Sequence, residues 1–438
     1  MIAIVGGGIS GLAVAHGLSE RGTPHVLFEA GAEPGGVMRT VWEDGLPLDV
    51  GPQRTRLTGE VERLVRAAGL ESEVLTASED LPLWVYRSGR LRRAPFNLGE
   101  AIRTDLLGWR AKLRILLEPF TGKLDPSETV ARFFVRKFGR EAYEHLIGPL
   151  YGGLYASDPA RMFARHGLQT TLERFGVGRS LLIALLRRGP AARSAMDAVT
   201  FREGIQALPN GLARSEGENV RLRTSAGSLA RVPGGRWRVH ADGPDGEESV
   251  EADAVVLSCP PPAAARLLEQ VAPEASARIS RLNSNPLAVV HLRSGFAGEG
   301  YGYQVAFGEP LETRGCTWNA SIFGRAGVFT CYLGGMKNPE LVRWADGRIG
   351  SLARREFRMV TGSDAEVLRV SRTRIPAWDG SWDALDGLSL PPGVHLCSNW
   401  SERPGIPGRA RDADRLAGFL SGDVAAVPHG PGEGRGRR

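Results

Sequence analysis

The first thirty residues contain a strand, a glycine-rich turn and a helix in immediate succession. The apolar run 2–5 is rich in β-branched residues, which is typical of a strand buried on both faces of a parallel sheet. It leads directly into a glycine-rich turn over residues 6–11, and the helix that follows should end near Gly22, a suitable left-handed C-cap. This order of elements predicts a dinucleotide-binding βαβ unit.

Each glycine of the turn has a separate physical role in such a unit. Gly6 permits the tight turn out of the strand, Gly8 lets a pyrophosphate approach the backbone, and Gly11 lets helix and sheet pack closely. A second apolar run ends in Glu29, 18 residues after Gly11, where a carboxylate accepts hydrogen bonds from a ribose 2′-hydroxyl. The predicted cofactor contacts in this part of the chain are Gly6, Gly8, Ile9, Ser10, Gly11, Glu29 and Ala30.

A second glycine pair bears on which dinucleotide the chain is expected to bind. Gly35 and Gly36 follow the ribose acid, Arg39 comes shortly after them, and Gly51 and Pro52 close the segment. This arrangement resembles the two-dinucleotide-binding pattern of FAD enzymes related to amine oxidases. The resemblance implies that the second glycine pair and Arg39 lie along the diphosphate and the flavin, whereas an ordinary surface turn is the alternative.

The composition is that of a soluble globular protein with two or three domains. The chain has 438 residues, of which 42% are hydrophobic and 24% charged. The net charge is +6, but the arginines are spread along the chain, so we expect no nucleic-acid partner and at most a basic surface that attracts an acidic substrate. The sequence indicates no oligomeric state.

The four cysteines and the N-terminus limit the chemistry and the location. Cys259, Cys316, Cys331 and Cys397 form no CxxC pair, so we expect reduced thiols and no metal site. Because the first strand begins at residue 2 and no apolar stretch reaches the ~18 residues of a membrane span, we expect a cytoplasmic protein.

The element pattern predicts an α/β fold with three parts. These are a Rossmann-like FAD-binding domain, a mixed α+β substrate domain and an inserted helical region. The FAD-binding domain is expected in three stretches (1–78, 200–280 and 391–427), the substrate domain in a hairpin (79–97) and residues 281–390, the helical insertion over 98–199, and a disordered tail over 428–438.

Three local patterns lead to expectations that a structure can test. Residues 220–223, 236–240 and 249–251 are expected to form a β-meander, and 316–322 to form a strand. The apolar helix over 109–120 carries interleaved basic residues, which fits a peripheral membrane contact, but we expect an internal core face instead. The hairpin residues Arg87, Arg90 and Arg92 fit either a solvated edge strand or a site that binds carboxylates.

Six segments, which together span most of the chain, carry a family resemblance: 35–52, 85–91, 138–142, 149–159, 201–208 and 253–260. The most specific is Gly-Gly-Leu-Tyr-Ala-Ser-Asp-Pro at 152–159. In these segments the chain resembles the protoporphyrinogen and coproporphyrinogen III oxidases of haem biosynthesis. The resemblance adds to the expected cofactor contacts Val220, Cys259, Gly405, Ile406 and Pro407, and to the expected substrate contacts Gly153 beside Arg87, Arg90 and Arg92.

The resemblance implies a porphyrinogen substrate that is oxidised by six electrons in three flavin turnovers, with hydride passing to the flavin and oxygen reoxidising it. No catalytic side chain or metal ligand is assigned, since a flavin supplies the chemistry. Two departures concern the substrate: Leu83 stands near where some relatives carry an arginine before the hairpin, and the final helix is highly charged over 409–415. The alternatives are an amine oxidase, a carotenoid-desaturase-like enzyme, or a catalytically idle FAD-binding protein.

Overall fold

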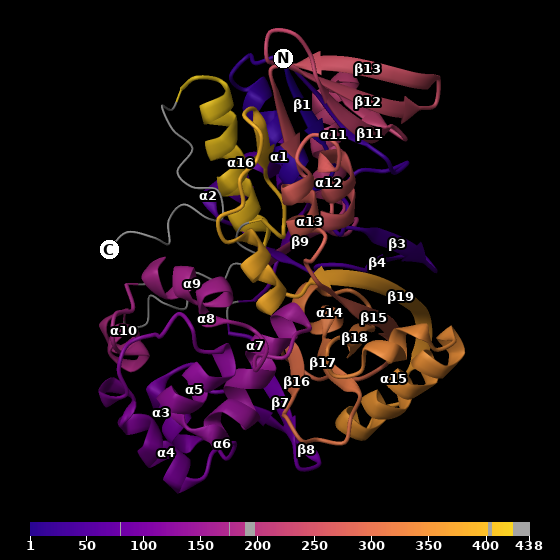
Figure 1. Ribbon diagram of the computed structural model, residues 1–438. Coiled ribbons are helices and arrows are strands. Elements are labelled where there is room, and N and C mark those ends of the chain that lie inside the picture. Colours follow the sequence, from indigo (N-terminus) through magenta and orange to yellow (C-terminus); the bar gives the residue numbers. More distant parts are fainter. Residues whose placement is uncertain (79, 175, 189–197, 402–404, 424–438) are drawn as a thin grey trace.

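A five-stranded parallel sheet is the centre of one half of the molecule. The computed structural model describes residues 1–78, 80–174, 176–188, 198–401 and 405–423. The strands lie in the order β10 (Val220–Leu222), β2 (His25–Glu29), β1 (Ile2–Val5), β14 (Ala254–Leu257) and β20 (Val394–Leu396), and every neighbouring pair is parallel. These strands come from three separate stretches of the chain (Figure 1). The predicted α/β fold class with a Rossmann-like sheet is confirmed, while the exact domain boundaries stay a prediction.

Four helices pack on one face of this sheet: α1 (Ile9–Ser19), α2 (Gly59–Ala67), α11 (Ala207–Glu216) and α16 (Ile406–Leu420). Helices α1 and α16 cross so closely that a Cβ on Gly17 would lie 2.8 Å from the Cβ of Ala417. Glu216 at the end of α11 accepts hydrogen bonds from Ser19 and His25. Burial opposes ionisation there, but these bonds and His16 lower the pKa of Glu216 to about 2, so the carboxylate stays charged between the helices.

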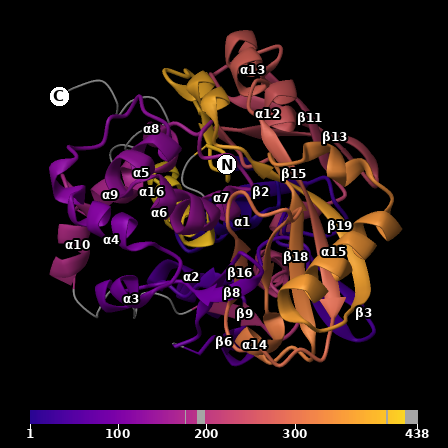
Figure 2. The same cartoon turned by 90° about the horizontal axis from the view of Figure 1, so that it is seen from below.

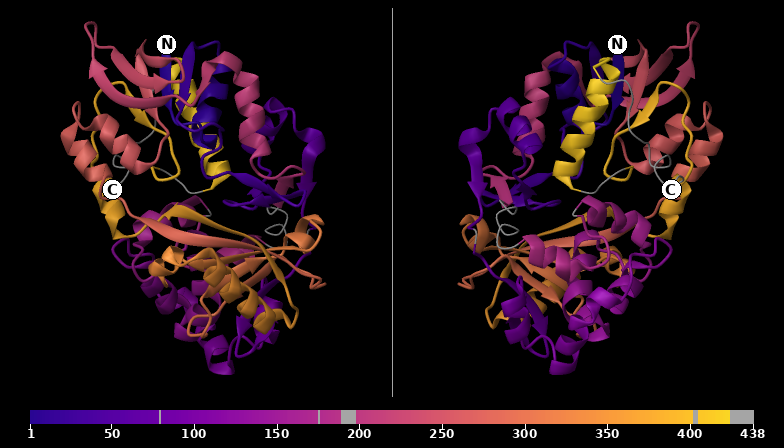
Figure 3. Two further views of the ribbon diagram at one scale, coloured as in Figure 1. Left: turned by 90° about the vertical axis from the view of Figure 1, so that its right-hand side faces the viewer. Right: turned by 90° about the vertical axis from the view of Figure 1, so that its left-hand side faces the viewer.

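A seven-stranded mixed sheet forms the second half. Its order is β19 (Glu366–Pro376), β15 (Ser284–Arg293), β18 (Val328–Gly334), β17 (Thr313–Thr317), β16 (Gly302–Val305), β7 (Leu83–Arg87) and β8 (Arg90–Arg93). Phe329, Cys331 and Leu333 alternate on one face and pack against α15 (Asp346–Thr361). The opposite face looks toward the parallel-sheet half, as the two side views show (Figure 3). We call it the inner face.

The inserted helical region lies beside the seven-stranded sheet, over its β7–β8 end (Figure 2). Ala94, Leu106 and Ala111 from this region pack on Val85 of β7. The helices are α3 (Leu98–Arg103), α4 (Trp109–Leu116), α5 (Val130–Phe138), α6 (Arg140–Ala142), α7 (Gly148–Tyr155), α8 (Ala164–Gly167), α9 (Gln169–Arg174) and α10 (Leu181–Arg188), with a 3₁₀ turn η2 (Glu118–Phe120) after α4 and a π turn η3 (Tyr143–Ile147) before α7.

Short elements complete the described fold. They are the pair β3 (Thr40–Glu43) and β4 (Leu46–Asp49), the sheet β5 (Thr55–Arg56), β9 (Ala198–Phe201) and β6 (Val74–Thr76), the helices α12 (Pro261–Leu268), α13 (Pro273–Ile279) and α14 (Asn319–Phe323), and the 3₁₀ turns η1 (Glu71–Glu73), η5 (Gly217–Asn219), η6 (Pro339–Arg343) and η7 (Gly380–Leu385). The predicted tail over 428–438 lies outside the described residues.

Two local strand predictions need correction. The meander consists of β11 (Ser225–Arg231), β12 (Trp237–Gly243) and β13 (Gly246–Ala252), whereas residues 220–222 pair in parallel with β2. The predicted strand 316–322 ends at residue 317, and α14 follows it. In both cases the tertiary partner decided the outcome, because short apolar runs suit several environments.

The prediction that the helix over 109–120 turns its apolar side toward the core is also wrong. Trp109 is 67% exposed and Phe120 78% exposed, and Leu113, Leu116 and Leu117 between them are exposed as well. In the part of the chain that the structure describes, no helix is long and apolar enough to cross a membrane.

A buried ion pair joins the two halves. Asp49, at the end of β4, has its carboxylate 2.8 Å from a guanidinium nitrogen of Arg325, and both side chains are buried. Asp49 also accepts hydrogen bonds from the Thr40 hydroxyl (2.6 Å) and the Ile205 amide (2.8 Å), while Arg325 donates to the Phe201 carbonyl (3.1 Å). Burial raises the pKa of Asp49, and the Arg325 charge opposes this rise. The pair therefore ties the β3–β4 segment and β9 to the seven-stranded sheet.

Replacing Arg325 with methionine should lower the free energy of unfolding by about 3–5 kcal/mol, because it leaves the Asp49 carboxylate buried without its counter-ion. The matched control is Arg293→Met, which breaks an exposed pair with Glu366 (2.8 Å) and should cost less than about 1 kcal/mol. Urea unfolding of both variants measures the difference. Equal midpoints would show that the Asp49–Arg325 pair does not hold the halves together.

Candidate functional site

The amino end of α1 lies at the carboxyl edge of the parallel sheet. Gly6 has φ +112°, and a Cβ there would lie 2.9 Å from the backbone nitrogen of Cys259. A Cβ on Gly11 would lie only 2.0 Å from the Gly6 carbonyl oxygen, so this position requires glycine. A Cβ on Gly8, by contrast, has no atom within 4 Å, and no side chain caps α1. Ile9 and Ser10 are buried in the first turn.

The second glycine pair lies against the first glycine turn. The Gly35 amide donates to the Gly7 carbonyl (2.8 Å), and residues 8 and 35 form a parallel bridge. Gly35 and Gly36 have φ of +120° and +59°. Both glycine loops therefore border the open side of Gly8, which is the arrangement that a dinucleotide diphosphate needs.

Residues 37–52 turn back toward this edge. A Cβ on Gly51 would lie 1.8 Å from the Val37 carbonyl oxygen, so glycine is obligatory where these two backbone segments meet. Pro52 is partly buried, and Arg39 is exposed with no ion pair to any described acidic residue. The His291 Nε2 on the inner face donates to the Asp49 carbonyl (3.0 Å), and burial lowers the pKa of His291 to about 4, so the ring is neutral.

Glu29 closes the other end of the glycine turn. Its carboxylate accepts hydrogen bonds from the Gly7 amide (2.6 Å) and the Gly31 amide (2.7 Å). Each carboxylate oxygen has two acceptor sites, so acceptor capacity remains for a ribose hydroxyl. Ala30 is exposed next to it, and Val220 lies in β10, which pairs with β2 on this side of the sheet.

Helix α16 begins near the same edge. Gly405 has φ +97° and no side chain caps the helix that Ile406 and Pro407 begin. The Cys259 carbonyl accepts a hydrogen bond from the Trp400 indole (2.8 Å), and burial raises the pKa of the Cys259 thiol to about 12, so the thiol is not a nucleophile.

The charges of α16 are neutralised within the fold. Asp412 accepts from Arg409 (2.8 Å), Arg411 donates to Glu60 (2.8 Å), and Asp414 is shared by Arg21 (3.1 Å) and Arg63 (3.2 Å). The charged residues over 409–415 thus form ion pairs that hold α16 against α2 and the residues after α1. These pairs fall on the packed faces of the helix and leave its first turn without an acidic residue.

The edge therefore has two uncapped helix ends, two joined glycine loops and an acidic ribose acceptor. The residues present fit FAD: Gly8, Gly35 and Gly36 would hold the diphosphate, Glu29 a ribose, and the first turn of α16 the flavin end, where its partial positive charge would stabilise a reduced flavin.

The sequence profile of the family described as "Flavin containing amine oxidoreductase" matches residues 9–406. The chain belongs to this family. Its cofactor is FAD, and it is a flavin-dependent oxidoreductase.

Several proteins resemble this family member along most of its length. It is 28% identical over 410 residues to protoporphyrinogen oxidase 1 of Spinacia oleracea, covering 85% of this chain and 73% of the spinach protein. It is 29% identical over 403 residues to coproporphyrinogen III oxidase of Mycobacterium leprae (strain TN), covering 87% and 84%. The fold matches that of a "Putative protoporphyrinogen oxidase" from Exiguobacterium sp. 255-15 with a TM-score of 0.78 at 22% identity, covering 97% and 99%.

The hairpin arginines lie at the β7–β8 edge of the seven-stranded sheet. Arg87 donates to the Leu106 carbonyl (2.6 Å), and Arg92 donates to Asp105 (2.9 Å) and to the Arg87 carbonyl. Arg90 is exposed at the strand's start. Arg87 and Arg92 are thus engaged by the helical region, and their contact with substrate stays a prediction.

The segment 152–159 forms the end of α7 and the turn that follows it. Ala156 adopts a left-handed conformation with φ +48°, and Ser157 donates to the Ala377 carbonyl (2.6 Å). A Cβ on Gly153 would lie 2.6 Å from the Gln304 side-chain oxygen, so α7 packs directly on β16.

The structure brings further polar residues to the inner face that sequence reasoning missed. Tyr332 and Thr317 share a hydrogen bond (3.1 Å), and Gln304 lies on the next strand. Arg54 and Arg314 join them. Arg54 comes two residues after Pro52, the end of the predicted segment, so its position was a usable signal, but nothing in the sequence around Arg314 distinguishes it.

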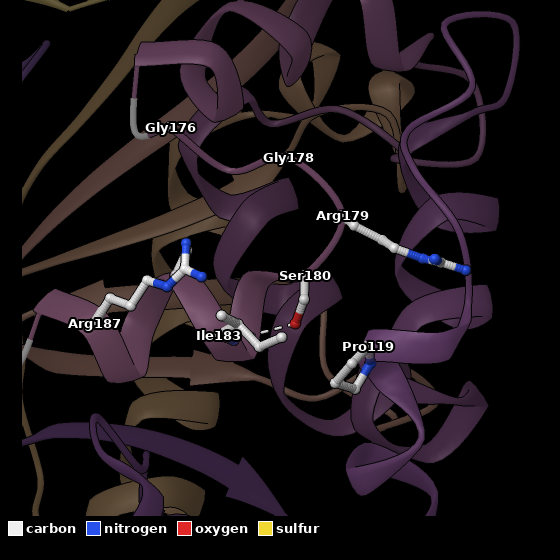
Figure 4. A pocket seen from close by; sticks show the side chains of 8 residues that line it. Pro119, Gly176, Gly178, Arg179, Ser180, Ile183 and Arg187 are labelled. Atoms are coloured by element: carbon white, nitrogen blue, oxygen red, sulfur yellow. Dashed lines mark hydrogen bonds between the residues drawn. The ribbon is translucent and has the colours of Figure 1, made fainter.

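A surface pocket lies in the helical region (Figure 4). It is lined by Pro119, Ser180 and Ile183, with Arg179 and Arg187 on opposite sides. Beside the pocket, the Leu181 amide donates to the Glu118 carboxylate (3.0 Å), which pairs with Lys137 at 3.0 Å. Neither Glu118 nor Lys137 lines the pocket itself. No residue of the predicted cofactor site lines it.

Replacing Gly8 with valine should give a folded protein without bound flavin, because the new side chain enters the open side of the glycine turn without a clash. The matched control is Gly59→Ala at the start of α2, where a Cβ also meets no atom and flavin should stay at the wild-type level. The absorbance ratio of flavin to protein and the circular dichroism spectrum report the outcome. A yellow Gly8→Val protein at full occupancy would contradict the assignment.

Proposed function

We propose that this protein oxidises a porphyrinogen, either coproporphyrinogen III or protoporphyrinogen IX, to the porphyrin in haem biosynthesis, with molecular oxygen as the electron acceptor. The observation that carries the proposal is that proteins named for these two reactions match it over most of its length, at 28% and 29% identity. The signature at 152–159 and the arginines near the inner face support it.

The protein's own part in this reaction is binding and orientation. When bound, FAD accepts hydride equivalents from the substrate. The two glycine loops and the first turn of α16 would hold the cofactor, while the inner face would present the substrate to it. The uncapped end of α16 favours a negative charge beside it, which is the charge that a reduced flavin develops.

An amine oxidase and a carotenoid-desaturase-like enzyme are the competing functions. An amine is cationic and a carotenoid is uncharged, whereas the described side chains that approach the inner face from both halves include Arg54 and Arg314. An acidic substrate suits these charges best. A catalytically idle FAD-binding protein is the remaining alternative.

The test is aerobic turnover of coproporphyrinogen III and of protoporphyrinogen IX, each followed by porphyrin fluorescence and by oxygen consumption, with aliphatic amines as the matched negative substrates. We expect porphyrin formation with one O₂ reduced to H₂O₂ for every two electrons removed. Bleaching of the flavin by porphyrinogen without oxygen would exclude the idle protein. Turnover of amines alone, or no reaction with either porphyrinogen, would overturn the proposal.

We also propose that the exposed helix α4 and turn η2 contact a membrane surface with anionic lipids. Trp109, Leu113, Leu116, Leu117 and Phe120 form the exposed apolar patch. Arg103, Arg110 and Lys123 near it are exposed, while Glu118, one of the two acidic residues over 102–123, is buried against Lys137. Pro119, between Leu117 and Phe120, lines the pocket of Figure 4, and the basic residues Arg179 and Arg187 line the same pocket. Apolar residues flanked by basic ones suit the interface of an anionic bilayer.

Replacing Phe120 with alanine should weaken binding to phosphatidylglycerol vesicles about 10- to 100-fold, the usual worth of burying one large apolar side chain. The matched control is Met359→Ala on α15, which is 53% exposed on the other side of the sheet and should bind like wild type. Vesicle co-sedimentation measures both. If the wild-type protein does not sediment with anionic vesicles, the membrane proposal is wrong, whether or not the protein oxidises porphyrinogens.

A further inference from the structure

Two arginines approach the inner face from opposite halves of the molecule without an acidic partner. Arg54 comes from the loop after Pro52 in the parallel-sheet half, and Arg314 comes from β17 in the seven-stranded sheet. Among the described residues neither guanidinium has a hydrogen bond or an ion pair, although most other partly buried arginines have both.

Arg54 lies over the aromatic ring of Tyr301. Its guanidinium carbon lies 5.0 Å from the ring centroid of Tyr301, and Tyr332 lies near it on the inner face. Burial lowers the pKa of Arg54, which means that its charge is poorly solvated by water and by protein. An arginine stays charged in a protein, so this site carries an uncompensated positive charge.

Arg314 is held at the other side of the same face. One of its terminal nitrogens lies 3.4 Å from where a Gly152 Cβ would stand, so α7 covers the side chain. Burial lowers the pKa of Arg314, and Asp158 offsets this only from beyond ion-pair distance. The next residue, Gly315, pairs with Tyr332 in the sheet, and Tyr332 is also a neighbour of Arg54.

We propose that Arg54 and Arg314 bind two carboxylates of one substrate, one from each half of the molecule. This inference rests on the proposed function and names the residues that select its substrate. A partly buried guanidinium without a counter-ion is unfavourable, and a carboxylate that binds bidentately would supply the missing charge and hydrogen bonds. Arg54 comes from the loop after Pro52 and Arg314 from β17, so each would bind a separate carboxylate. A macrocycle with carboxylates on separate side chains offers two such groups, whereas a monocarboxylate offers one.

The hairpin prediction is the competing assignment. Arg87 and Arg92 already bind Leu106 and Asp105, so a substrate would have to displace those contacts. Arg54 and Arg314 would gain a partner without losing one. Some relatives have an arginine near the position of Leu83, which lies on β7. Leu83 supplies no cation at the inner face, and Arg54 and Arg314 would take the place of the missing arginine.

The test compares holoenzyme variants Arg54→Gln and Arg314→Gln with wild type on coproporphyrinogen III, protoporphyrinogen IX and coproporphyrinogen III tetramethyl ester. Each substitution should lower kcat/KM for the free acids about 10- to 100-fold, the worth of a charge-assisted hydrogen bond. It should leave turnover of the ester, which carries no carboxylate, nearly unchanged. A merely structural role would lower all three alike and would also change flavin content.

Arg56→Gln is the matched control, because Arg56 is exposed on β5 two residues from Arg54 and should behave like wild type. A second comparison with Arg87→Ala tests the hairpin directly. If wild type turns over porphyrinogens while Arg54→Gln and Arg314→Gln do so equally well, this inference is wrong and the proposed function stands. If wild type turns over neither porphyrinogen, the proposed function fails first.

Discussion

The buried contact between Asp49 and Arg325 is the interaction on which the arrangement of the two halves depends. The two charged groups lie 2.8 Å apart with both side chains buried, and further hydrogen bonds support each of them. Thr40 and Ile205 bind the carboxylate from the parallel-sheet half, and the Phe201 carbonyl receives the guanidinium. A carboxylate that is so buried cannot remain charged without a partner, so the seven-stranded sheet must dock where Arg325 can reach it.

This docking sets the distance between the cofactor edge and the inner face. The backbone after Asp49 continues through Gly51, where the Val37 carbonyl leaves no room for a Cβ, and into Gln53, which accepts a hydrogen bond from Asn319 at 3.0 Å. His291 adds a bond to the Asp49 carbonyl from β15. One short segment thus belongs to the glycine-loop edge and to the inner face at the same time. A substitution that moves it would alter cofactor and substrate contacts together.

Electrostatic pairing explains why a highly charged final helix is compatible with a flavin site. Arg409, Arg411 and Asp414 each have a partner on α16 itself, α1 or α2. The helix therefore packs through ion pairs as well as through Ala413 and Ala417, and its uncapped first turn stays free for the cofactor. In contrast, Arg54 and Arg314 lack such partners, and this difference separates arginines that hold the fold from those that we assign to substrate.

The sequence alone determined the parts of this protein whose physics is local. A buried strand, a turn that only glycine can make and a helix with Gly11 against Gly6 are all neighbours in the chain, so their pattern predicts the βαβ unit, and the spacing to Glu29 and Gly35 predicts the cofactor. The helix over 109–120 shows where such reasoning ends, because an apolar stripe looks the same whether it faces a core or solvent. Only the tertiary structure decided that this stripe is exposed, that residues 220–222 join a parallel sheet, and that Arg54 and Arg314 are partly buried without a counter-ion among the described residues. Burial and charge compensation depend on partners hundreds of residues away, and no local pattern contains them.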